Sequence, residues 1–261
     1  MSFNFPHASA AVLLPDLSLP VPLTTVLFDL DDTLFDHIGT ARAALAATAG
    51  ADVRLQAVDP EVLYQHYSEL LEEIHVQLLA GRYTYEAARR LRFERLLGPY
   101  GVGTDEADAI AQRHYRRYQQ LRRPLPGALA LLEALKPNYR IGVVTNNRTL
   151  EQEEKLRYLG MRHLVDVLIT SEDVGVPKPD ARIFEVALAR LGTQPAEAVL
   201  VGDNWTADVL GALGAGIRPV WINRTGASRP QAHVQELAGL LPLPAVWQTI
   251  TGRTAVVGAA V

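Results

Sequence analysis

The stretch TVLFDLDDT, residues 25–33, decides the fold because it joins an apolar run directly to three carboxylates. The apolar part, which predicts a strand over residues 25–30, is typical of a strand buried on both faces. Asp29, Asp31 and Asp32 lie where this strand should end. In an open parallel sheet, the carboxyl ends of the strands are where ligands bind. The stretch therefore indicates either a ligand site at a strand end or a polar turn that only leaves the strand.

Four further apolar runs predict the rest of a sheet, and they cover residues 140–145, 166–170, 198–202 and 218–222. Helical patterns lie between the later runs, and in one of them Thr149 and Gln152 have the spacing of an N-terminal capping box. Strands that alternate with helices imply right-handed crossovers and a parallel sheet covered on both faces. We therefore expect an α/β fold with a Rossmann-like parallel sheet core.

Residues 37–124 contain no convincing strand, although they separate the first two apolar runs. Instead they have helical patterns around residues 39–49, 59–80, 84–98 and 104–122. Because this connection is too long for a loop in a compact domain, we expect a helical cap domain inserted after the first strand. The segment Pro124–Gly127 is the expected hinge. The expected parts are an N-terminal extension (1–22), an α/β hydrolase core (23–36 and 125–225), the cap (37–124) and a C-terminal segment that packs on the core (226–261).

Composition excludes several classes of protein. The 25 Lys and Arg residues against 29 Asp and Glu residues give a net charge of −4, which argues against binding a nucleic acid polymer through a basic face. The chain has no cysteine, so a disulfide scaffold, a thiolate metal site and a cysteine nucleophile are all excluded. The first 22 residues lack a positive n-region and contain four prolines, unlike a signal peptide. No stretch is long and apolar enough to span a membrane, so we expect a cytoplasmic protein.

A second acidic group follows the run at residues 198–202. Asp203 comes directly after Gly202, and Asp208 lies five residues further on. Carboxylates that meet at the strand ends of one sheet crowd negative charge, and a divalent cation relieves it. Hard oxygen ligands of this kind suit Mg²⁺. A Gly-Asp pair is also a common turn, but two acidic groups at the ends of strands in one sheet favour a site.

Two further segments are suited to bind phosphate. Thr145 and Asn146 lie between a strand end and a helix start, where a hydroxyl, an amide and free backbone N–H groups would hold an anion, or simply cap the helix. Lys178 lies between two prolines that fix its backbone, and it is one of only three lysines in the chain. It would offset charge between carboxylates and phosphate, the alternative being a solvated surface lysine.

Taken in order along the chain, these residues resemble the four motifs of the haloacid-dehalogenase-like hydrolase superfamily. The motifs are Asp29-x-Asp31-x-Thr33, Thr145-Asn146, Lys178 and Gly202-Asp203-x-x-x-x-Asp208. The resemblance extends from about residue 24 to residue 224, and it is closest to members with a helical cap between the first two motifs. It implies a phosphatase of nucleotides or sugar phosphates.

The resemblance also implies a role for each residue. Asp29 would attack phosphorus and form an aspartyl-phosphate, and Asp31 would serve as general acid and then as general base. The ligands implied for Mg²⁺ are the Asp29 side chain, the Asp31 backbone carbonyl and Asp203, with Asp208 in support. Thr145, Asn146 and Lys178 would bind the transferring phosphoryl group, and Thr33 would support the loop.

Two branches of the superfamily fit less well. The dehalogenases that gave it its name lack an acid two residues after the nucleophile, whereas Asp31 stands there, and such an acid is needed to expel an alkoxide rather than a halide. The phosphonate hydrolases need a cap lysine, and residues 37–123 contain none. We therefore expect a Mg²⁺-dependent phosphomonoester hydrolase acting on a small phosphorylated metabolite. A phosphomutase or a non-catalytic ligand-binding member is the alternative.

The cap is where the substrate should be selected. Its arginines and aromatic residues could pair with or stack on a nucleotide or sugar phosphate, or they could form a solvated helix face balanced by acids. The sequence leaves both possibilities open, and it leaves the oligomeric state open as well. The residues concerned are Arg89, Arg90, Arg92, Arg116, Arg117, Tyr83, Tyr85, His114 and Tyr115.

Overall fold

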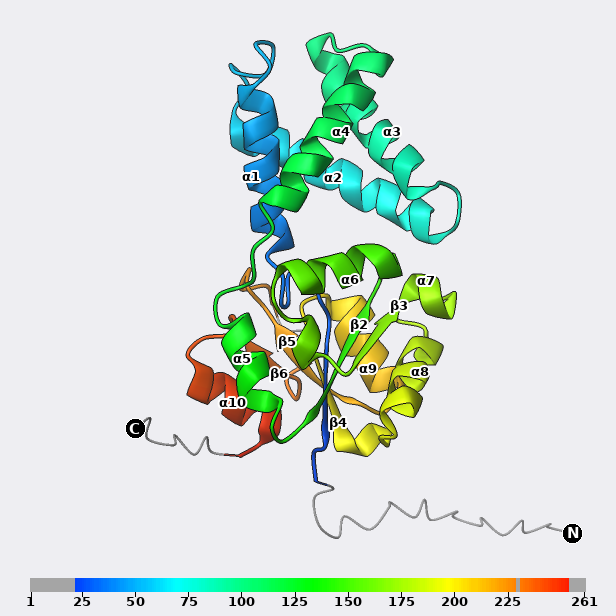
Figure 1. The fold of residues 1–261 in the computed structure, drawn as a ribbon, viewed down its shortest axis with the longest axis vertical. Coiled ribbons are helices and arrows are strands. Elements are labelled where there is room, and N and C mark those ends of the chain that lie inside the picture. Colours follow the sequence, from blue (N-terminus) through cyan, green and yellow to red (C-terminus); the bar gives the residue numbers. More distant parts are fainter. Residues whose placement is uncertain (1–21, 229–230, 254–261) are drawn as a thin grey trace, which may run out of the picture.

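The computed structural model describes residues 22–228 and 231–253, which form a parallel α/β layer with a helical layer above it (Figure 1). The predicted fold class, a Rossmann-like parallel sheet with a helical cap inserted after the first strand, is confirmed. The N-terminal extension expected at residues 1–22 lies outside the described residues, apart from Pro22. Among the described residues, no helix has the length and apolar character that crossing a membrane requires.

The sheet has six strands in the order β3-β2-β1-β4-β5-β6, and every neighbouring pair is parallel. All five predicted strands are present, although the first ends at Phe28 rather than at residue 30 because the chain turns there. The sixth was not predicted because its sequence, QEL, is polar and lies at the sheet edge. The strands are β1 Thr25–Phe28, β2 Arg140–Thr145, β3 Val167–Thr170, β4 Ala198–Gly202, β5 Arg218–Ile222 and β6 Gln235–Leu237.

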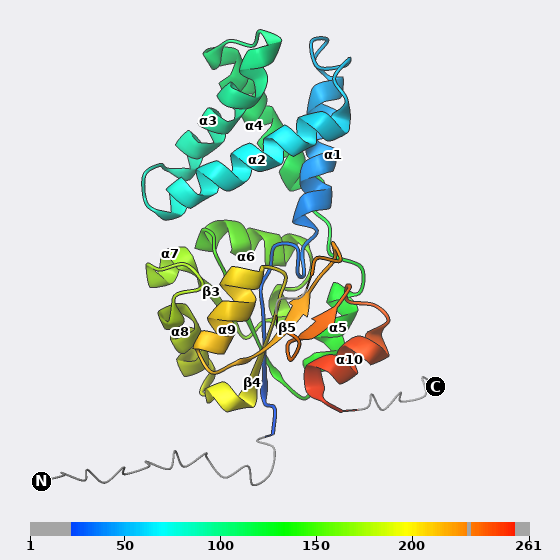
Figure 2. The ribbon, with the colours of Figure 1, turned by 180° about the vertical axis from the view of Figure 1, so that it is seen from behind.

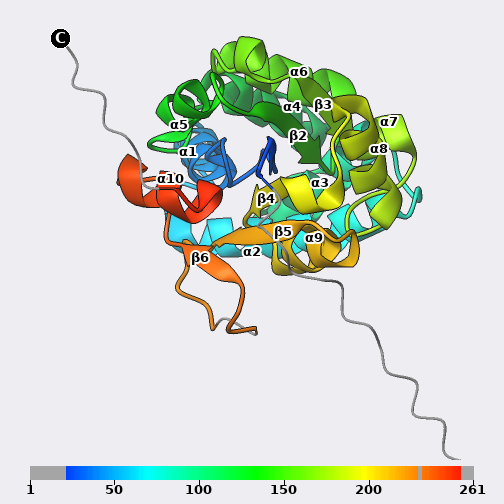
Figure 3. The same cartoon turned by 90° about the horizontal axis from the view of Figure 1, so that it is seen from below.

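Helices cover both faces of the sheet because alternate strand residues point to opposite sides. Val26 and Phe28 of β1 join the core under α5, α6 and α10, whereas Leu27 joins the core under α8 and α9. Figure 3 shows α5 and α10 on one side of the strands and α8 and α9 on the other. These helices are α5 Ala128–Leu135, α6 Thr149–Tyr158, α8 Ala181–Leu191, α9 Gly211–Gly214 and α10 Leu243–Thr251, with the short α7 Ser171–Val174 and the π-helix Trp205–Leu210.

Four helices lie above the carboxyl ends of the strands (Figures 1 and 2). Side chains cap the starts of three of them: the Asp36 carboxylate accepts the Gly39 N–H at 3.2 Å, the Asp59 carboxylate accepts the Glu61 N–H at 2.7 Å, and the Thr84 hydroxyl accepts the Ala87 N–H at 3.1 Å. All four correspond to predicted helices. They are α1 His37–Gly50, α2 Pro60–Leu79, α3 Tyr85–Leu97 and α4 Thr104–Gln120, and short 3₁₀ turns occur at Gly98–Tyr100, Arg162–Leu164 and Pro195–Glu197.

The two chain segments that connect the helical layer to the sheet run side by side. Phe35 and Pro124 form an antiparallel bridge. On either side of it, the Asp36 N–H donates to the Arg123 carbonyl at 3.1 Å, and the Leu125 N–H donates to the Leu34 carbonyl at 2.8 Å. The chain therefore leaves the α/β layer and returns to it at the same place.

The C-terminal helix α10 lies against α5, with Val246 and Ile250 buried in the shared core. Trp247 of this helix contacts the ring of Tyr139 at a centroid distance of 5.8 Å. Residues 254–261 of the predicted C-terminal segment lie outside the described residues.

The predicted capping box of Thr149 and Gln152 is wrong. Arg148 is the N-cap residue of α6, and its side chain makes no capping hydrogen bond. The Thr149 N–H instead donates to the Glu172 carboxylate at 2.9 Å, so an acid from the β3–α7 region satisfies the helix start. Gln152 is fully buried and makes its hydrogen bonds elsewhere.

His114 is a buried group in the helical layer whose titration should affect stability. Its ring packs against Phe93 and Tyr67 at centroid distances of 4.9 and 5.5 Å, and its Nδ1 lies 3.3 Å from the Thr48 hydroxyl. Burial, with the charge of Arg92, lowers the pKa of His114 to about 3. The folded protein therefore keeps this imidazole neutral at pH values where an unfolded chain would protonate it.

We expect the free energy of unfolding to fall as pH drops from about 6 to about 4, because only the unfolded chain then binds a proton at His114. One proton corresponds to a slope of up to about 1.4 kcal/mol per pH unit. Urea unfolding between pH 4 and pH 7.5 measures how the free energy of unfolding changes with pH. For His114→Phe this change should be smaller by the contribution of that one proton. The exposed His163→Gln serves as control; equal slopes for His114→Phe and wild type would contradict the prediction.

Candidate active site

The candidate site lies at the carboxyl ends of the three central strands. Asp29 follows β1, and its N–H donates to the Val201 carbonyl of β4 at 2.9 Å. Thr145 ends β2 and Asp203 follows β4. The eight residues predicted from sequence are brought together here by direct contacts or through a shared neighbour. They are Asp29, Asp31, Thr33, Thr145, Asn146, Lys178, Asp203 and Asp208.

The loop after β1 wraps around one carbonyl group. The Leu30 carbonyl accepts the N–H groups of Leu34 and Phe35 at 3.0 and 2.9 Å, and the Asp32 N–H donates to the Phe35 carbonyl at 2.7 Å. Asp32 has a φ of 63°, which aspartate tolerates better than most residues. This tight turn places Asp29 and Asp31 beside the strand ends and directs the chain into α1.

Lys178 is a buried cation between two carboxylates. Its Nζ lies 2.6 Å from Asp29 Oδ1 and 2.7 Å from Asp208 Oδ1, and it donates to the Val144 carbonyl at 2.8 Å. The two neighbouring acids raise the pKa of Lys178 against the opposing effect of burial. It is therefore a fixed positive charge, and the alternative of a solvated surface lysine is excluded.

Asn146 holds the backbone of Lys178. Its Oδ1 accepts the Lys178 N–H at 2.7 Å, and its Nδ2 donates to the Lys178 carbonyl at 3.0 Å. Both ends of the Asn146 amide are thus engaged within the protein. Asn146 therefore fixes the backbone from which the Lys178 side chain extends.

The carboxylates of Asp29, Asp203 and Asp208 offer oxygen atoms that all lie within 4.8 Å of one another. Burial, opposed by Lys178, raises the pKa of Asp29 to about 7, and burial with neighbouring carboxylates raises the pKa of Asp203 well above its usual value. One lysine therefore does not neutralise the group. Such an uncompensated set of hard oxygen ligands fits Mg²⁺.

Asp208 takes part in this group as a support. Its Oδ1 accepts from Lys178 and its Oδ2 accepts the Asn204 N–H at 2.9 Å. A Cβ atom at Gly202 would lie 2.4 Å from the Asp208 carboxylate, so only glycine permits this approach. The Thr33 hydroxyl lies 3.3 Å from Asp203 Oδ1 and steadies that carboxylate. The residues that could hold the metal are therefore Asp29 and Asp203, because Lys178 and the Asn204 N–H already engage Asp208.

Asp31 has its own cationic partner, which the sequence did not reveal. Lys155 Nζ lies 2.7 and 3.0 Å from the two Asp31 oxygens, and Gln152 Nε2 lies 3.1 Å from Asp31 Oδ2. Although burial opposes it, Lys155 together with His37 lowers the pKa of Asp31 to about 2. The available signal was the spacing of Gln152 and Lys155, which puts both on one helix face, together with the scarcity of lysine.

Aromatic residues lie close to the ion pair of Lys155 and Asp31. His37 Nδ1 lies 2.7 Å from the Tyr118 hydroxyl, and the ring of Phe35 contacts both rings at centroid distances of 6.3 and 6.0 Å. Lys155 Nζ lies 5.1 Å from the centroid of Phe35, in cation–π range. Lys155 is thereby shielded from solvent as well as paired.

Most of the cap residues named from sequence are engaged in contacts within the protein. Arg89 lies over the ring of Tyr115 at 3.5 Å, and Arg92 donates to the Tyr67 hydroxyl at 2.9 Å. Arg122, which the sequence did not single out, is buried near Tyr115 and Tyr118, and its Nε and Nη2 have no hydrogen-bond partner within the described residues. Of the others, Arg90 pairs with Glu94, Tyr85 faces Arg148 of α6, His114 is buried, and Arg116 and Arg117 are exposed.

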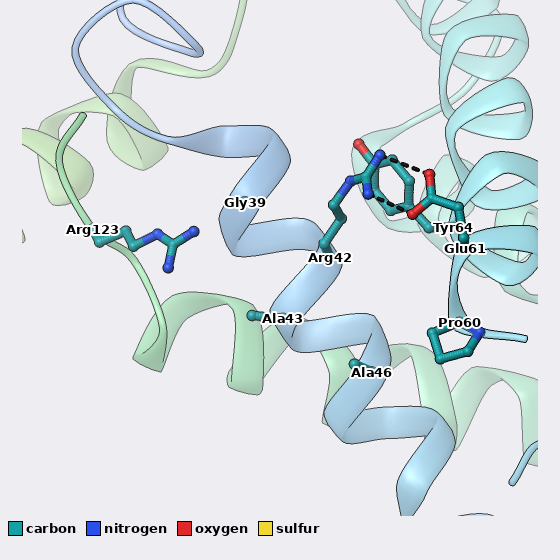
Figure 4. A pocket seen from close by; sticks show the side chains of 8 residues that line it. All are labelled: Gly39, Arg42, Ala43, Ala46, Pro60, Glu61, Tyr64 and Arg123. Carbon is teal, nitrogen blue, oxygen red and sulfur yellow. Dashed lines mark hydrogen bonds and ion pairs between the residues drawn. The ribbon is translucent and has the colours of Figure 1, made fainter. Parts of the chain in front are cut away.

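A cavity of about 410 Å³ lies between α1 and the start of α2 and is bordered by Arg123 (Figure 4). Arg42 crosses it, forms an ion pair with Glu61 and lies 4.1 Å from the ring centroid of Tyr64. Its two arginines already have acidic partners, since Arg123 pairs with Asp36. None of the lining residues belongs to the carboxylate group, so this cavity is not the catalytic centre.

Comparison with known proteins gives consistent matches. The family described as haloacid dehalogenase-like hydrolase matches residues 23–216. The glyceraldehyde 3-phosphate phosphatase of Methanothermobacter thermautotrophicus is 34% identical over 82% of this chain and 92% of its own. The pyrimidine 5'-nucleotidase YjjG of Escherichia coli is 31% identical over 79% and 88%. The putative HAD-hydrolase YfnB of Bacillus subtilis, solved bound to magnesium, shares the fold with a TM-score of 0.73, at 24% identity over 87% of this chain and 99% of its own.

We expect Mg²⁺ to stabilise the chelator-treated protein, because a ligand that binds only the folded state shifts unfolding by mass action. The gain is about 2.7 kcal/mol at one hundred times the dissociation constant. It should be larger at pH 8 than at pH 6, because Asp29, whose pKa is raised to about 7, releases its proton over that range. Thermal melts with and without Mg²⁺ measure the shift in Tm. Asp203→Asn should lose most of it and the exposed Asp105→Asn should keep it; an unchanged shift in Asp203→Asn would refute the site.

Proposed function

The chain belongs to the haloacid dehalogenase-like hydrolases and is a phosphatase of that family, and on this premise we propose a Mg²⁺-dependent mechanism through an aspartyl-phosphate. One observation carries the proposal. Lys178 Nζ donates to one oxygen of the Asp29 carboxylate, Oδ1, at 2.6 Å. A carboxylate that is held by one oxygen and surrounded by other acids is suited to act as a nucleophile next to a bound cation.

Asp29 acts as the nucleophile. Lys178 holds its Oδ1, which leaves Oδ2 to form a bond with phosphorus while the bond from phosphorus to the ester oxygen breaks. The Thr145 hydroxyl and the backbone N–H of Asn146 bind the oxygens of the transferring phosphoryl group. Lys178, whose three hydrogens go to protein oxygens, stabilises the phosphoryl group through its positive charge. Asp29, the Asp31 carbonyl and Asp203 would hold Mg²⁺, which would supply the positive charge that lets a carboxylate approach a phosphate dianion.

Asp31 transfers the protons. Lys155 keeps Asp31 ionised in the free protein, so in the first step Asp31 takes the proton of a substrate phosphate monoanion and passes it to the oxygen of the leaving alcohol. In the second step it takes a proton from the water that cleaves the aspartyl-phosphate, so one carboxyl group serves both steps. Asp31 follows the central strand β1 and lies close to His37 and Tyr118, and from there it would reach the ester oxygen of a substrate bound at Asp29.

Residues 37–124 act as a cap that closes the site and selects the substrate. Contacts to α6 join the cap to the core: Arg148 pairs with Glu86 at 2.8 Å, and the Tyr158 hydroxyl donates to the Gln120 carbonyl at 2.8 Å. Excluding water strengthens the electrostatic interactions around the phosphoryl group. The hinge is the pair of adjacent segments at residues 34–36 and 123–125.

The substrate is a small phosphorylated metabolite in the cytoplasm, such as a nucleotide or a sugar phosphate. The two curated relatives support this class because their names specify a triose phosphate and a nucleotide. The net charge of −4 does not suit a nucleic acid polymer.

Replacing the nucleophile should abolish turnover. We expect Asp29→Asn to lower kcat for phosphate release by about 10³-fold or more, because an amide oxygen does not displace an alkoxide from phosphorus. Release of inorganic phosphate from p-nitrophenyl phosphate measures it. Asp105→Asn, an exposed substitution on α4, should retain full activity. Near-normal turnover by Asp29→Asn would exclude the covalent mechanism.

A screen of nucleotides, sugar phosphates and phosphorylated acids, with and without Mg²⁺, should identify substrates that release phosphate only with the metal. The same reactions are followed for isomerised phosphate esters, because a phosphomutase returns the phosphoryl group to a sugar while a phosphatase delivers it to water. Isomer formation without free phosphate would favour the mutase, and binding without any turnover would favour a non-catalytic member.

A further inference from the structure

Lys155 is a buried cation that the four motifs do not include. Its side chain is 1% exposed, and it reaches both oxygens of Asp31 from α6. The next acidic group, Glu151 Oε1, lies 3.8 Å from Lys155 Nζ, beyond hydrogen-bond distance. Removing an ammonium group from water costs several kcal/mol unless a partner offsets it. The ion pair with Asp31 is therefore what keeps Lys155 at this place in the core.

Gln152 connects Asp31 to the phosphate-binding turn. Its Nε2 lies 3.1 Å from Asp31 Oδ2 and 2.6 Å from the Thr145 hydroxyl oxygen, and it lies one turn before Lys155 on the same face of α6. Because the amide donates to the Thr145 oxygen, the hydroxyl hydrogen of Thr145 remains free to donate to a phosphoryl oxygen. One face of one helix thus touches both the proton-transfer carboxyl and the anion-binding hydroxyl.

The two carboxylates of the motif Asp29-x-Asp31 are held by two different lysines from two different directions. Lys178 binds Asp29 and lies with Asp208 on the β4 side, whereas Lys155 binds Asp31 from α6, which follows β2. Two acids so close in sequence would otherwise compete for one cation. Separate partners keep the nucleophile and the proton-transfer group in distinct orientations.

We propose that Lys155, together with Gln152, is a positioning residue that orients Asp31 for proton transfer and links its orientation to the phosphoryl group bound at Thr145. This rests on the proposed function, in which Asp31 protonates the leaving oxygen. Neither Lys155 nor Gln152 contacts the reacting atoms. Lys155 acts through Asp31, and Gln152 acts through Asp31 and Thr145. Their loss should slow only reactions that need the proton.

The leaving group distinguishes this role from a structural one. When the bond from phosphorus to the ester oxygen breaks, p-nitrophenolate leaves readily without a proton, whereas phenolate, the anion of a much weaker acid, depends more on protonation by Asp31. The two aryl phosphates have similar shape, so a general loss of folding or binding lowers both rates by the same factor. A misplaced Asp31 lowers the rate for phenyl phosphate more.

The test measures kcat and KM for phenyl and p-nitrophenyl phosphate with Mg²⁺ in the intact protein. We expect Lys155→Met to lower kcat for phenyl phosphate about tenfold more than for p-nitrophenyl phosphate, with little change in KM. A tenfold difference is a fraction of the rate increase that general acid catalysis typically supplies. Lys155→Arg, which keeps the charge, should recover most of the difference. Asp31→Asn should show the same preference, and adding Lys155→Met to it should not increase the preference.

The matched control is Lys136→Met. Lys136 also pairs with an aspartate, Asp166, at 2.5 Å, but on the surface of the protein, and its loss should leave the ratio of the two rates unchanged. Gln152→Met keeps the ion pair while it removes the link to Thr145, and it should shift the ratio in the same direction, so it tests the idea even if Lys155→Met does not fold.

Equal losses on the two substrates for Lys155→Met or for Gln152→Met would overturn the positioning role, as would a preference that adds to that of Asp31→Asn. If Asp31→Asn itself shows no preference between the substrates, the proton-transfer role in the proposed function fails. If Asp31→Asn shows the preference and the α6 variants do not, only the inference about Lys155 and Gln152 fails.

Discussion

The contact on which the site depends is the buried ammonium group of Lys178 between Asp29 and Asp208. It gathers the residue after β1, Asp208 beyond β4 and the Val144 carbonyl of β2 around one charge. Without this lysine, buried carboxylates would face one another with no opposing charge, and each would be forced to take up a proton. The parallel sheet brings these groups together, and the cation lowers the cost of ionising them without neutralising the whole group.

The fold was predicted from sequence to the extent that it follows from local patterns. The apolar runs ending at Asp29 and Asp203 predicted central strands, and the four motifs predicted the residues that gather at their ends. The sixth strand, Gln235–Leu237, has no such pattern because an edge strand with exposed side chains needs no apolar residues. Its pairing with β5 is a tertiary effect that the local sequence does not encode.

The errors at the site have a shared physical cause. The spacing of Thr149 and Gln152 suits a capping box, but Glu172 from a distant segment satisfies the helix start, and Gln152 is then free to bond Asp31. Likewise, Lys155 has the sequence context of a solvated helix lysine, and only the packing of α6 under Phe35 makes it a buried partner of an acid. Motifs identify residues that touch the reactants, and they do not identify the residues that hold them.

The adjacent connections at Phe35 and Pro124 also determine how easily the helical insert could be exchanged. The chain returns to within hydrogen-bond distance of the point where it left. The α/β layer therefore needs no more from this connection than a short turn would provide. The entropic cost of such a loop grows only slowly with its length, so insert size places little constraint on the core. The helical layer is in this sense an exchangeable part: a different insert grafted between these two positions would meet the same carboxylates, and specificity can diverge while the chemistry stays the same.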